Sequence, residues 1–197
     1  MPSPAFPRPL ARHPGFVRLL VAWLALVSPG SPADLPKLTE AEVKAAYVFN
    51  FAKYVEWPEA AFSGTNTPFV IGVLGPDPVG ESLRAVVAGK LINGRTFELR
   101  RTGPDAGLAG CHILFLPATE RTRLADLAPL LRDHPVLTVS DTEAFIQQGG
   151  VIGLVKRGGN IRLQINLEAA HAAGLKVSSK LLTLADQVKG RPAKSKD

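Results

Sequence analysis

The sequence predicts an α/β fold with three layers, in which a mostly parallel sheet of about five or six strands has helices on both faces. Segments of strand length alternate with segments of helical periodicity, and most of the strand segments are continuously apolar. Strands covered on both faces have this pattern, because both faces meet helices. A polar turn at residues 156–160 further predicts that the last two strands form an antiparallel hairpin at the C-terminal edge.

The elements follow in order from local signals. Thr39 and Glu42 have the spacing of a capping box, in which a hydroxyl and a carboxylate satisfy free amides at the start of a helix. We expect this helix to run to about Val55, because Trp57-Pro58 disfavours helical backbone. Beyond it we expect strands at residues 69–74, 96–101, 112–116, 136–139, 151–155 and 161–165, and helices at residues 79–88, 121–131, 142–147, 167–173 and 179–188.

The N-terminal segment has the layout of a secretory signal peptide. Three arginines precede the apolar run 19–27, and Ser31 and Ala33 place small side chains before a cleavage site after Ala33. An uncleaved anchor is the alternative, but it has only the 12 residues 16–27, whereas crossing a bilayer takes about 20. We therefore expect residues 1–33 to be removed and the mature chain to be periplasmic, without spanning the membrane.

The net charge of +6 is concentrated at the two ends of the chain. Three basic residues lie in residues 1–33 and four in residues 189–197, which leaves 16 basic and 16 acidic residues in the body of the chain. A neutral body without a basic stripe offers no track for phosphates, so we expect no nucleic-acid partner. We expect residues 34–188 to form one domain and residues 189–197 to be a disordered basic tail.

The motifs that suggest chemistry are incomplete. The loop 75–82 resembles a phosphate-binding loop, but Glu81 stands where lysine is needed, and two prolines remove amide donors. Glu168 and His171 have helical spacing for a metal but lack further ligands. The single cysteine, Cys111, opens an apolar strand and is expected to be a small buried hydrophobe. We expect no enzyme, no cofactor and no metal.

Two features have the pattern of binding surfaces. Alternation in residues 161–166 places Arg162, Gln164 and Asn166 on one face, where they form a row of donors, although an exposed edge strand shows the same pattern. The first helix has two apolar stripes where a surface helix needs one. The extra stripe either docks a partner or a second copy in a homodimer, or is buried within its own domain. Burial is the simpler expectation.

Several stretches, in order, resemble the YfiR family, which is also described as DUF4154. The resemblance spans residues 38–188, and its first and last stretches are the longest. The matching stretches are residues 43–58, 71–75, 93–95, 111–115, 137–141, 149–152, 165–166 and 175–182.

The resemblance implies a periplasmic α/β protein without catalytic activity. The best understood members of the family bind the periplasmic part of an inner-membrane diguanylate cyclase and keep it inactive, until an outer-membrane lipoprotein sequesters them. Cyclic di-GMP and biofilm formation then rise. Other membrane sensors are also found beside family members. Better known members carry disulfides, and with only Cys111 this chain cannot form an internal one.

The candidate binding residues fall in two groups. Within family-like stretches, Arg95, Arg162 and Asn166 are hard to explain by packing, and Trp57 is a large aromatic able to anchor an interface. The alternative function is a periplasmic small-molecule receptor, which would use the crevice at the strand ends, near residues 75–80 and 118–119 and at Ser140 and Asp141. An N-cap role for Ser140 or Asp141 is the simpler interpretation of that pair.

Overall fold

The computed structural model of the protein describes residues 37–103, 107–131 and 134–190. The predicted signal peptide and nearly all of the predicted tail lie outside these ranges. Within them, no helix combines the length and the apolar character that a membrane span requires.

The helices begin at the signals seen in the sequence. Thr39 and Glu42 form the predicted capping box at the start of α1. Asp77 caps α2, with Pro78 in the first turn, so the loop 75–82 is a tight strand-to-helix connection. The helices are α1 (Glu40–Tyr54), α2 (Pro78–Val87), α3 (Leu124–Leu131), α4 (Leu167–Ala172) and α5 (Ser179–Leu184), with short 3-10 turns at Glu59–Ala61, Leu108–Gly110 and Ala118–Arg123.

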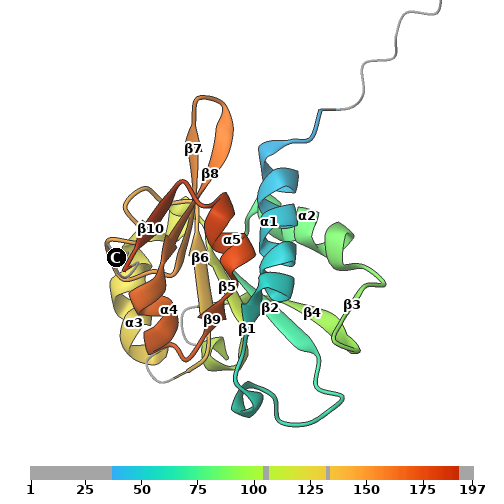
Figure 1. Ribbon diagram of the computed structural model, residues 1–197. Helices are drawn as coiled ribbons and strands as arrows, with labels where there is room; N and C mark the ends of the chain where they lie inside the picture. The colour runs from blue at the N-terminus through green and yellow to red at the C-terminus, as the bar shows by residue number, and fades with distance from the viewer. Residues whose placement is uncertain (1–36, 104–106, 132–133, 191–197) are drawn as a thin grey trace, which may run out of the picture. The chain divides into compact units, whose positions relative to one another are not determined.

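The described residues form an eight-stranded sheet and a separate two-stranded one (Figure 1). The large sheet has the order β10-β8-β7-β6-β5-β2-β4-β3, and the small sheet pairs β1 with β9. The strands are β1 (Val55–Glu56), β2 (Phe69–Leu74), β3 (Leu91–Ile92), β4 (Arg95–Thr102), β5 (Ile113–Leu116), β6 (Leu137–Ser140), β7 (Ile152–Arg157), β8 (Asn160–Asn166), β9 (Lys176–Val177) and β10 (Gln187–Lys189).

Most strand pairs of the large sheet are parallel, and the antiparallel pairs are β7–β8 and β3–β4. The predicted α/β class is therefore confirmed, with eight strands in this sheet instead of five or six. The predicted hairpin is also present, and Gly158 and Gly159 make its turn with positive φ angles. β10 lies outside this hairpin and forms the actual edge.

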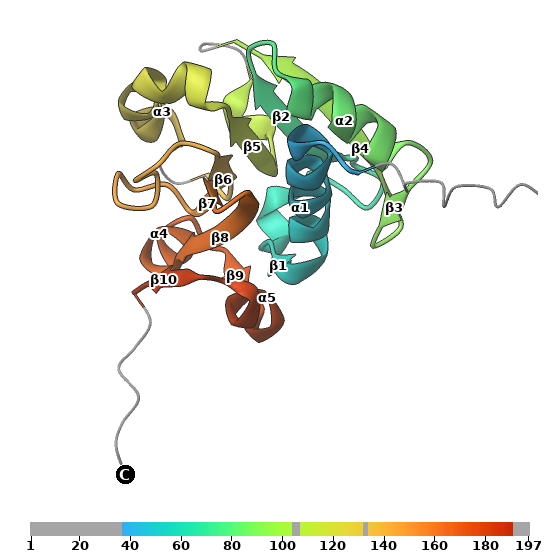
Figure 2. The same cartoon turned by 90° about the horizontal axis from the view of Figure 1, so that it is seen from above.

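Two apolar cores cover the two faces of the sheet. The larger core packs α1, α2 and α5 against one face, with Phe51 and Phe115 among its fully buried side chains. The smaller core packs α3 against the other face through Leu124 and Leu127. Seen from above, α1 and α2 lie side by side and away from α3 (Figure 2). The layers match the prediction.

Two predicted helices were wrong in part or in whole. Residues 142–149 form turns, because Ala144 has a φ of 59°, which a right-handed helix excludes. The last helix ends at Leu184, and Gln187–Lys189 pair in parallel with β8, where the Gln164 amide donates to the Gln187 side chain. β10 covers residues 164–166 of β8, so the interpretation of residues 161–166 as an exposed edge strand was wrong for this half. Residues 161–163 pair with β7 alone among the described residues, and Arg162 is exposed.

The close approach of Gly150 to Phe145 gives a stability test. A β-carbon at Gly150 would lie 2.1 Å from the Phe145 ring, whereas one at Gly103 would meet nothing within 4 Å. We expect Gly150→Ala to lower the free energy of unfolding by about 1–3 kcal/mol, because the buried ring must move. Gly103→Ala should change it by less than about 0.5 kcal/mol. Urea denaturation measures both, and equal effects would contradict the packing described.

Candidate functional site

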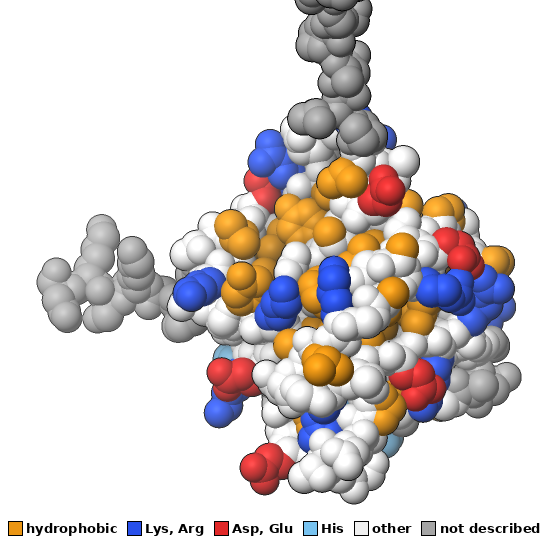
Figure 3. Space-filling view, turned by 90° about the vertical axis from the view of Figure 1, so that its right-hand side faces the viewer, with side chains coloured by type: hydrophobic (Ala, Val, Ile, Leu, Met, Phe, Trp, Pro, Cys, Tyr) orange, Lys and Arg blue, Asp and Glu red, His pale blue; other side chains and the backbone are white. Residues whose placement is uncertain are grey.

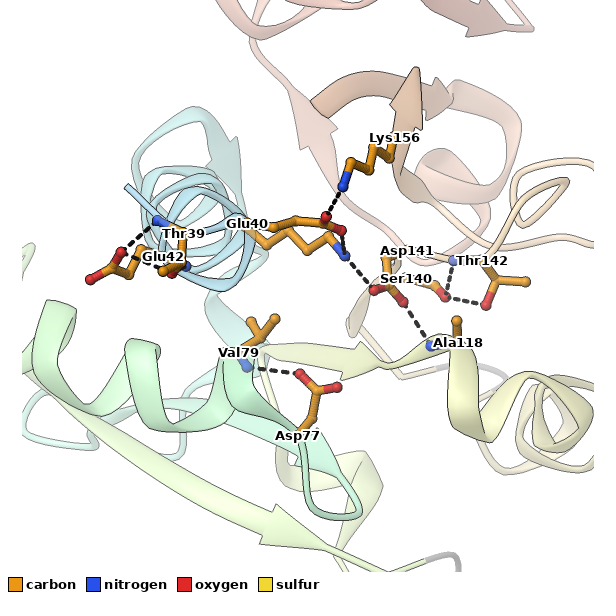
Figure 4. Close-up of polar contacts among 11 residues, drawn as sticks. Thr39, Glu40, Glu42, Asp77, Val79, Ala118, Ser140, Asp141, Thr142 and Lys156 are labelled. Carbon is orange, nitrogen blue, oxygen red and sulfur yellow. Dashed lines mark hydrogen bonds and ion pairs between the residues drawn. The ribbon is translucent and has the colours of Figure 1, made fainter. Parts of the chain in front are cut away.

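The carboxyl ends of β2, β5 and β6 meet at the point where the strand order reverses. From β2 the chain continues to β4 on one side, and from β5 to β6 on the other. Ligands of open α/β sheets bind in the crevice at such a point. Here the crevice holds Asp77, Ser140 and Asp141, together with a lysine from α1 (Figure 4).

Lys44 fills this crevice with its ammonium group. Its Nζ lies 2.6 Å from Asp141 Oδ2 and 2.6 Å from Glu40 Oε1. The Lys44 and Asp141 side chains are only 9% and 14% exposed. Burial alone would lower the pKa of Lys44, but its hydrogen bonds to Asp141 and Glu40 outweigh burial and raise that pKa. Lys44 is therefore a fixed positive charge at the centre of the crevice.

Further contacts tie three parts of the chain to this lysine. Asp141 Oδ1 accepts a hydrogen bond of 2.7 Å from the Ala118 amide, so both carboxylate oxygens of Asp141 are engaged. Glu40 Oε2 lies 2.7 Å from Lys156 Nζ in β7. Hydrogen bonds from Lys156 and Lys44 lower the pKa of Glu40 to about 2. The cluster links α1, the turn after β5, the end of β6 and the β7–β8 hairpin (Figure 4).

Asp77 and Ser140 complete the surroundings of the cluster. Asp77 Oδ1 accepts from the Val79 amide, and burial, with the nearby charge of Asp141, raises the Asp77 pKa. Buried Ser140 accepts from the Thr142 amide and donates to the Thr142 hydroxyl. Neither Ser140 nor Asp141 caps a helix, because turns follow them. Ser140 therefore orders the backbone after β6, and Asp141 fixes α1 through its ion pair with Lys44.

The sequence interpretation missed Lys44, although a signal was present. The residues of α1 that face the core include Lys44, Val48 and Phe51, at helical spacing. A lysine within such a stripe requires a carboxylate on the element that it packs against. Asp141 is that carboxylate, 97 positions away in the sequence. The other stripe, which contains Tyr47 and Tyr54, is half-buried against the same core.

Trp57 and Arg95 both line a surface depression of about 690 Å³. The Trp57 indole donates to the His112 carbonyl at 3.1 Å and packs edge-on against Phe69. Arg95 Nη1 donates to the carbonyls of Gly64 and Thr67 at 2.7 and 2.8 Å. Both side chains therefore also have structural roles within the domain.

The remaining two candidates, Arg162 and Asn166, lie apart. Asn166 is buried; its side chain caps α4 through the Ala169 amide and donates to the Ile146 carbonyl. Packing and hydrogen bonding thus explain Asn166. Arg162 is exposed on β8, and among the described residues no hydrogen bond or ion pair holds its guanidinium.

Cys111 and His112 are both buried. Burial raises the pKa of the Cys111 thiol to about 11, as expected for an inert structural cysteine. The His112 ring stacks against both Phe62 and Phe69, 4.5 and 4.8 Å from their centres, and these two rings are 6.4 Å apart. Its Nδ1 accepts from the Val70 amide at 3.0 Å, and its Nε2 has no hydrogen-bond partner among the described residues.

The mostly parallel sheet, with helices packed against both of its faces, makes this a three-layer α/β domain. The chain belongs to the family of YfiR/HmsC-like domains (DUF4154), whose family model matches residues 41–186. The fold is similar to that in a crystal structure of a conserved domain protein from Vibrio cholerae, with a TM-score of 0.53 and 13% identity. That match covers 78% of this chain and 61% of the Vibrio chain.

The Lys44–Asp141 ion pair predicts a large effect on stability. Lys44→Met leaves Asp141 buried beside Glu40 without a cation, so we expect it to lower the free energy of unfolding by roughly 3–5 kcal/mol. Adding Asp141→Asn should restore a large part of this loss. Arg84→Met is the control, since the Arg84–Glu81 pair is 64% and 63% exposed, and it should cost less than about 1 kcal/mol. Chemical denaturation would contradict the buried pair if the two methionine variants behaved alike.

His112 predicts a pH dependence of stability. Burial, with the positive charges of Arg95 and Arg100, lowers the pKa of His112 below its usual value of about 6.5. The unfolded chain therefore binds a proton at His112 more tightly than the folded chain does. The contribution of neutral His112 to the free energy of unfolding is fully present above about pH 6.5 and falls as the pH decreases, by up to roughly 1.4 kcal/mol per pH unit.

His112→Phe keeps the ring stack and removes this titration. It should flatten the dependence of unfolding free energy on pH between about 7.5 and 5.5, although its overall stability is lower because the Val70 amide loses its acceptor. The control is the exposed His171, for which His171→Phe should retain the wild-type slope. Equal slopes in wild type and His112→Phe would refute the assignment.

Proposed function

We propose that the protein is a periplasmic regulatory binding protein that keeps an inner-membrane diguanylate cyclase inactive and so limits cyclic di-GMP and biofilm formation. The observation that carries this proposal is the family match over residues 41–186, nearly all of the described domain. The predicted signal peptide supports a periplasmic location. On this proposal an outer-membrane lipoprotein relieves the inhibition by sequestering the protein.

The described crevice is consistent with binding in place of catalysis. Both oxygens of Asp141 are engaged, and Lys44 is shared between two carboxylates, so neither is free to act as a nucleophile or base. A binding protein inhibits by contacting one conformation of its receptor and not the other, which shifts the population towards that conformation. The ion-paired cluster would support this role by holding α1 and the β7–β8 hairpin in one arrangement.

A small-molecule receptor is the second candidate function, and one observation favours it. A cavity of about 330 Å³ lies among residues of α3, β6 and α4, with walls that include Leu124, Val136 and Ala169. This volume is at the lower end for ligand pockets. Lys44 fills the crevice that we predicted for a ligand, whereas no Lys, Arg, Asp or Glu is among the residues that line this cavity. A ligand-dependent rise in melting temperature would support this candidate.

Deletion of the gene tests the proposed function directly. Loss of a repressor should raise cellular cyclic di-GMP, and expression of the full chain with its N-terminal segment should restore the original level. An unchanged cyclic di-GMP level in the deletion strain would reject the cyclase-repressor function. Crosslinking in cells, followed by purification of the protein from membranes, then identifies the partner.

Arg162 is a candidate contact residue for the partner, because its side chain is exposed and makes no hydrogen bond or ion pair with the described residues. If it contacts the partner, Arg162→Ala should weaken complex formation by about tenfold, as the loss of one interfacial arginine does. Its melting temperature should stay within about 1–2 °C of wild type, since the side chain is exposed. Asn166→Ala is the contrasting variant, because loss of its buried contacts should lower the melting temperature instead.

A further inference from the structure

The depression lined by Trp57 and Arg95 borders a continuous series of aromatic ring contacts, and Phe62 and Phe69 belong both to this series and to the lining. Arg95 lies over one face of Phe62 at 4.2 Å, and His112 stacks against Phe62 at 4.5 Å. The series continues through Phe69 to Phe97, whose ring centres are 5.5 Å apart, and Phe97 contacts Phe49 at 5.5 Å. This aromatic cluster, the apolar wall of the surface, therefore runs from the depression to Phe49 of α1, which is 8% exposed.

Positive charge is concentrated along this wall. The ammonium groups of Lys53 and Lys90 lie 4.5 and 4.6 Å from the centre of the Phe49 ring, and Arg95 covers Phe62. Among the described residues, no carboxylate lies within ion-pair distance of these three cations. Glu56 is an acidic residue in the lining of the depression. A domain that is neutral in total thus carries a locally positive surface here.

The surface is longer than the depression itself. Next to Lys90, Leu91 of the edge strand β3 is 60% exposed. On the side of the molecule where β3 lies, Lys and Arg side chains are distributed among apolar ones across the face (Figure 3). Lys90 and Leu91 lie outside the lining of the depression, so an extended chain that reaches them as well as Arg95 fits this surface better than a small molecule, which would leave part of it uncovered.

We propose that this surface, formed by Trp57, Phe62, Arg95, Lys53, Lys90 and Leu91, binds an acidic segment of a partner protein. Carboxylates of the segment would pair with the three cations, and an apolar side chain between them would enter the depression beside Trp57. The proposal rests on the proposed function for the identity of the partner, the periplasmic part of the cyclase. It adds the place of contact and the chemistry of the recognised segment.

Charge reversal tests the surface without a cyclase. The probe is a fluorescein-labelled peptide of Glu and Asp residues with a central Phe, and its binding to the mature protein is followed by fluorescence polarisation. The double variant Lys53→Glu, Lys90→Glu should weaken binding by about tenfold or more, and added salt should weaken binding to wild type. The control is Arg121→Glu with Lys180→Glu, two exposed cations on other elements, which should change binding less than about twofold.

Three outcomes would overturn the proposal. In the first, the acidic peptide binds no better than a peptide in which Gln and Asn replace Glu and Asp. In the second, the two double variants weaken binding equally. In the third, phenylacetate alone displaces the peptide, which would assign the surface to a small anion. Melting temperatures of both double variants check that they are folded.

In the deletion strain, the Lys53, Lys90 variant should fail to lower cyclic di-GMP, and the control variant should lower it as wild type does. A photo-crosslinking residue at Leu91 should link to the cyclase, and one at Leu184, which is similarly exposed at 67%, should not. If expression of the wild-type chain in the deletion strain leaves cyclic di-GMP unchanged, the proposed function fails. The peptide assay then still tests whether the surface binds acidic segments.

Discussion

The position of α1 depends on one buried contact, the ion pair between Lys44 and Asp141. A charge that leaves water without a partner costs several kcal/mol, so the helix is held in the register that brings Lys44 to the ends of β5 and β6. Glu40 and Lys156 extend the same constraint to the β7–β8 hairpin. The crevice that many α/β proteins leave for a ligand is here used to join helix, sheet and hairpin.

The sequence predicted the elements whose signals are local. Continuous apolar strands, the Thr39 capping box and the glycine turn at 158–159 each depend on neighbouring residues, and all were confirmed. The elements that were missed depend on distant ones. β10 is a strand only because β8 lies beside it, and the turns at 142–149 need a left-handed Ala144, which alanine does not favour by itself.

Polar residues in the family-like stretches were harder to interpret for the same reason. Arg95 is explained by carbonyls in the loop at Gly64 and Thr67, and Asn166 by the Ile146 carbonyl, none of which a linear reading identifies as partners. Ser140 and Asp141 were correctly placed at the strand ends, but their partners Thr142, Ala118 and Lys44 show that they organise the chain there. The sequence shows where polar residues stand, but only their contacts show whether a side chain supports the fold or is available to bind a partner.

The lengths of the outermost strands have a consequence for behaviour at high concentration. β3 and β10, which border the large sheet on its two sides, have two and three residues. They cover only Arg95 and Thr96 of β4 and Gln164–Asn166 of β8, so among the described residues the outer sides of residues 97–102 and 160–163 face no strand. Exposed charges on these stretches, such as Arg100, Arg101 and Arg162, oppose intermolecular strand pairing. The apolar central strands are thus flanked by outer strands whose charges, and not a disulfide, guard the sheet against pairing with another molecule.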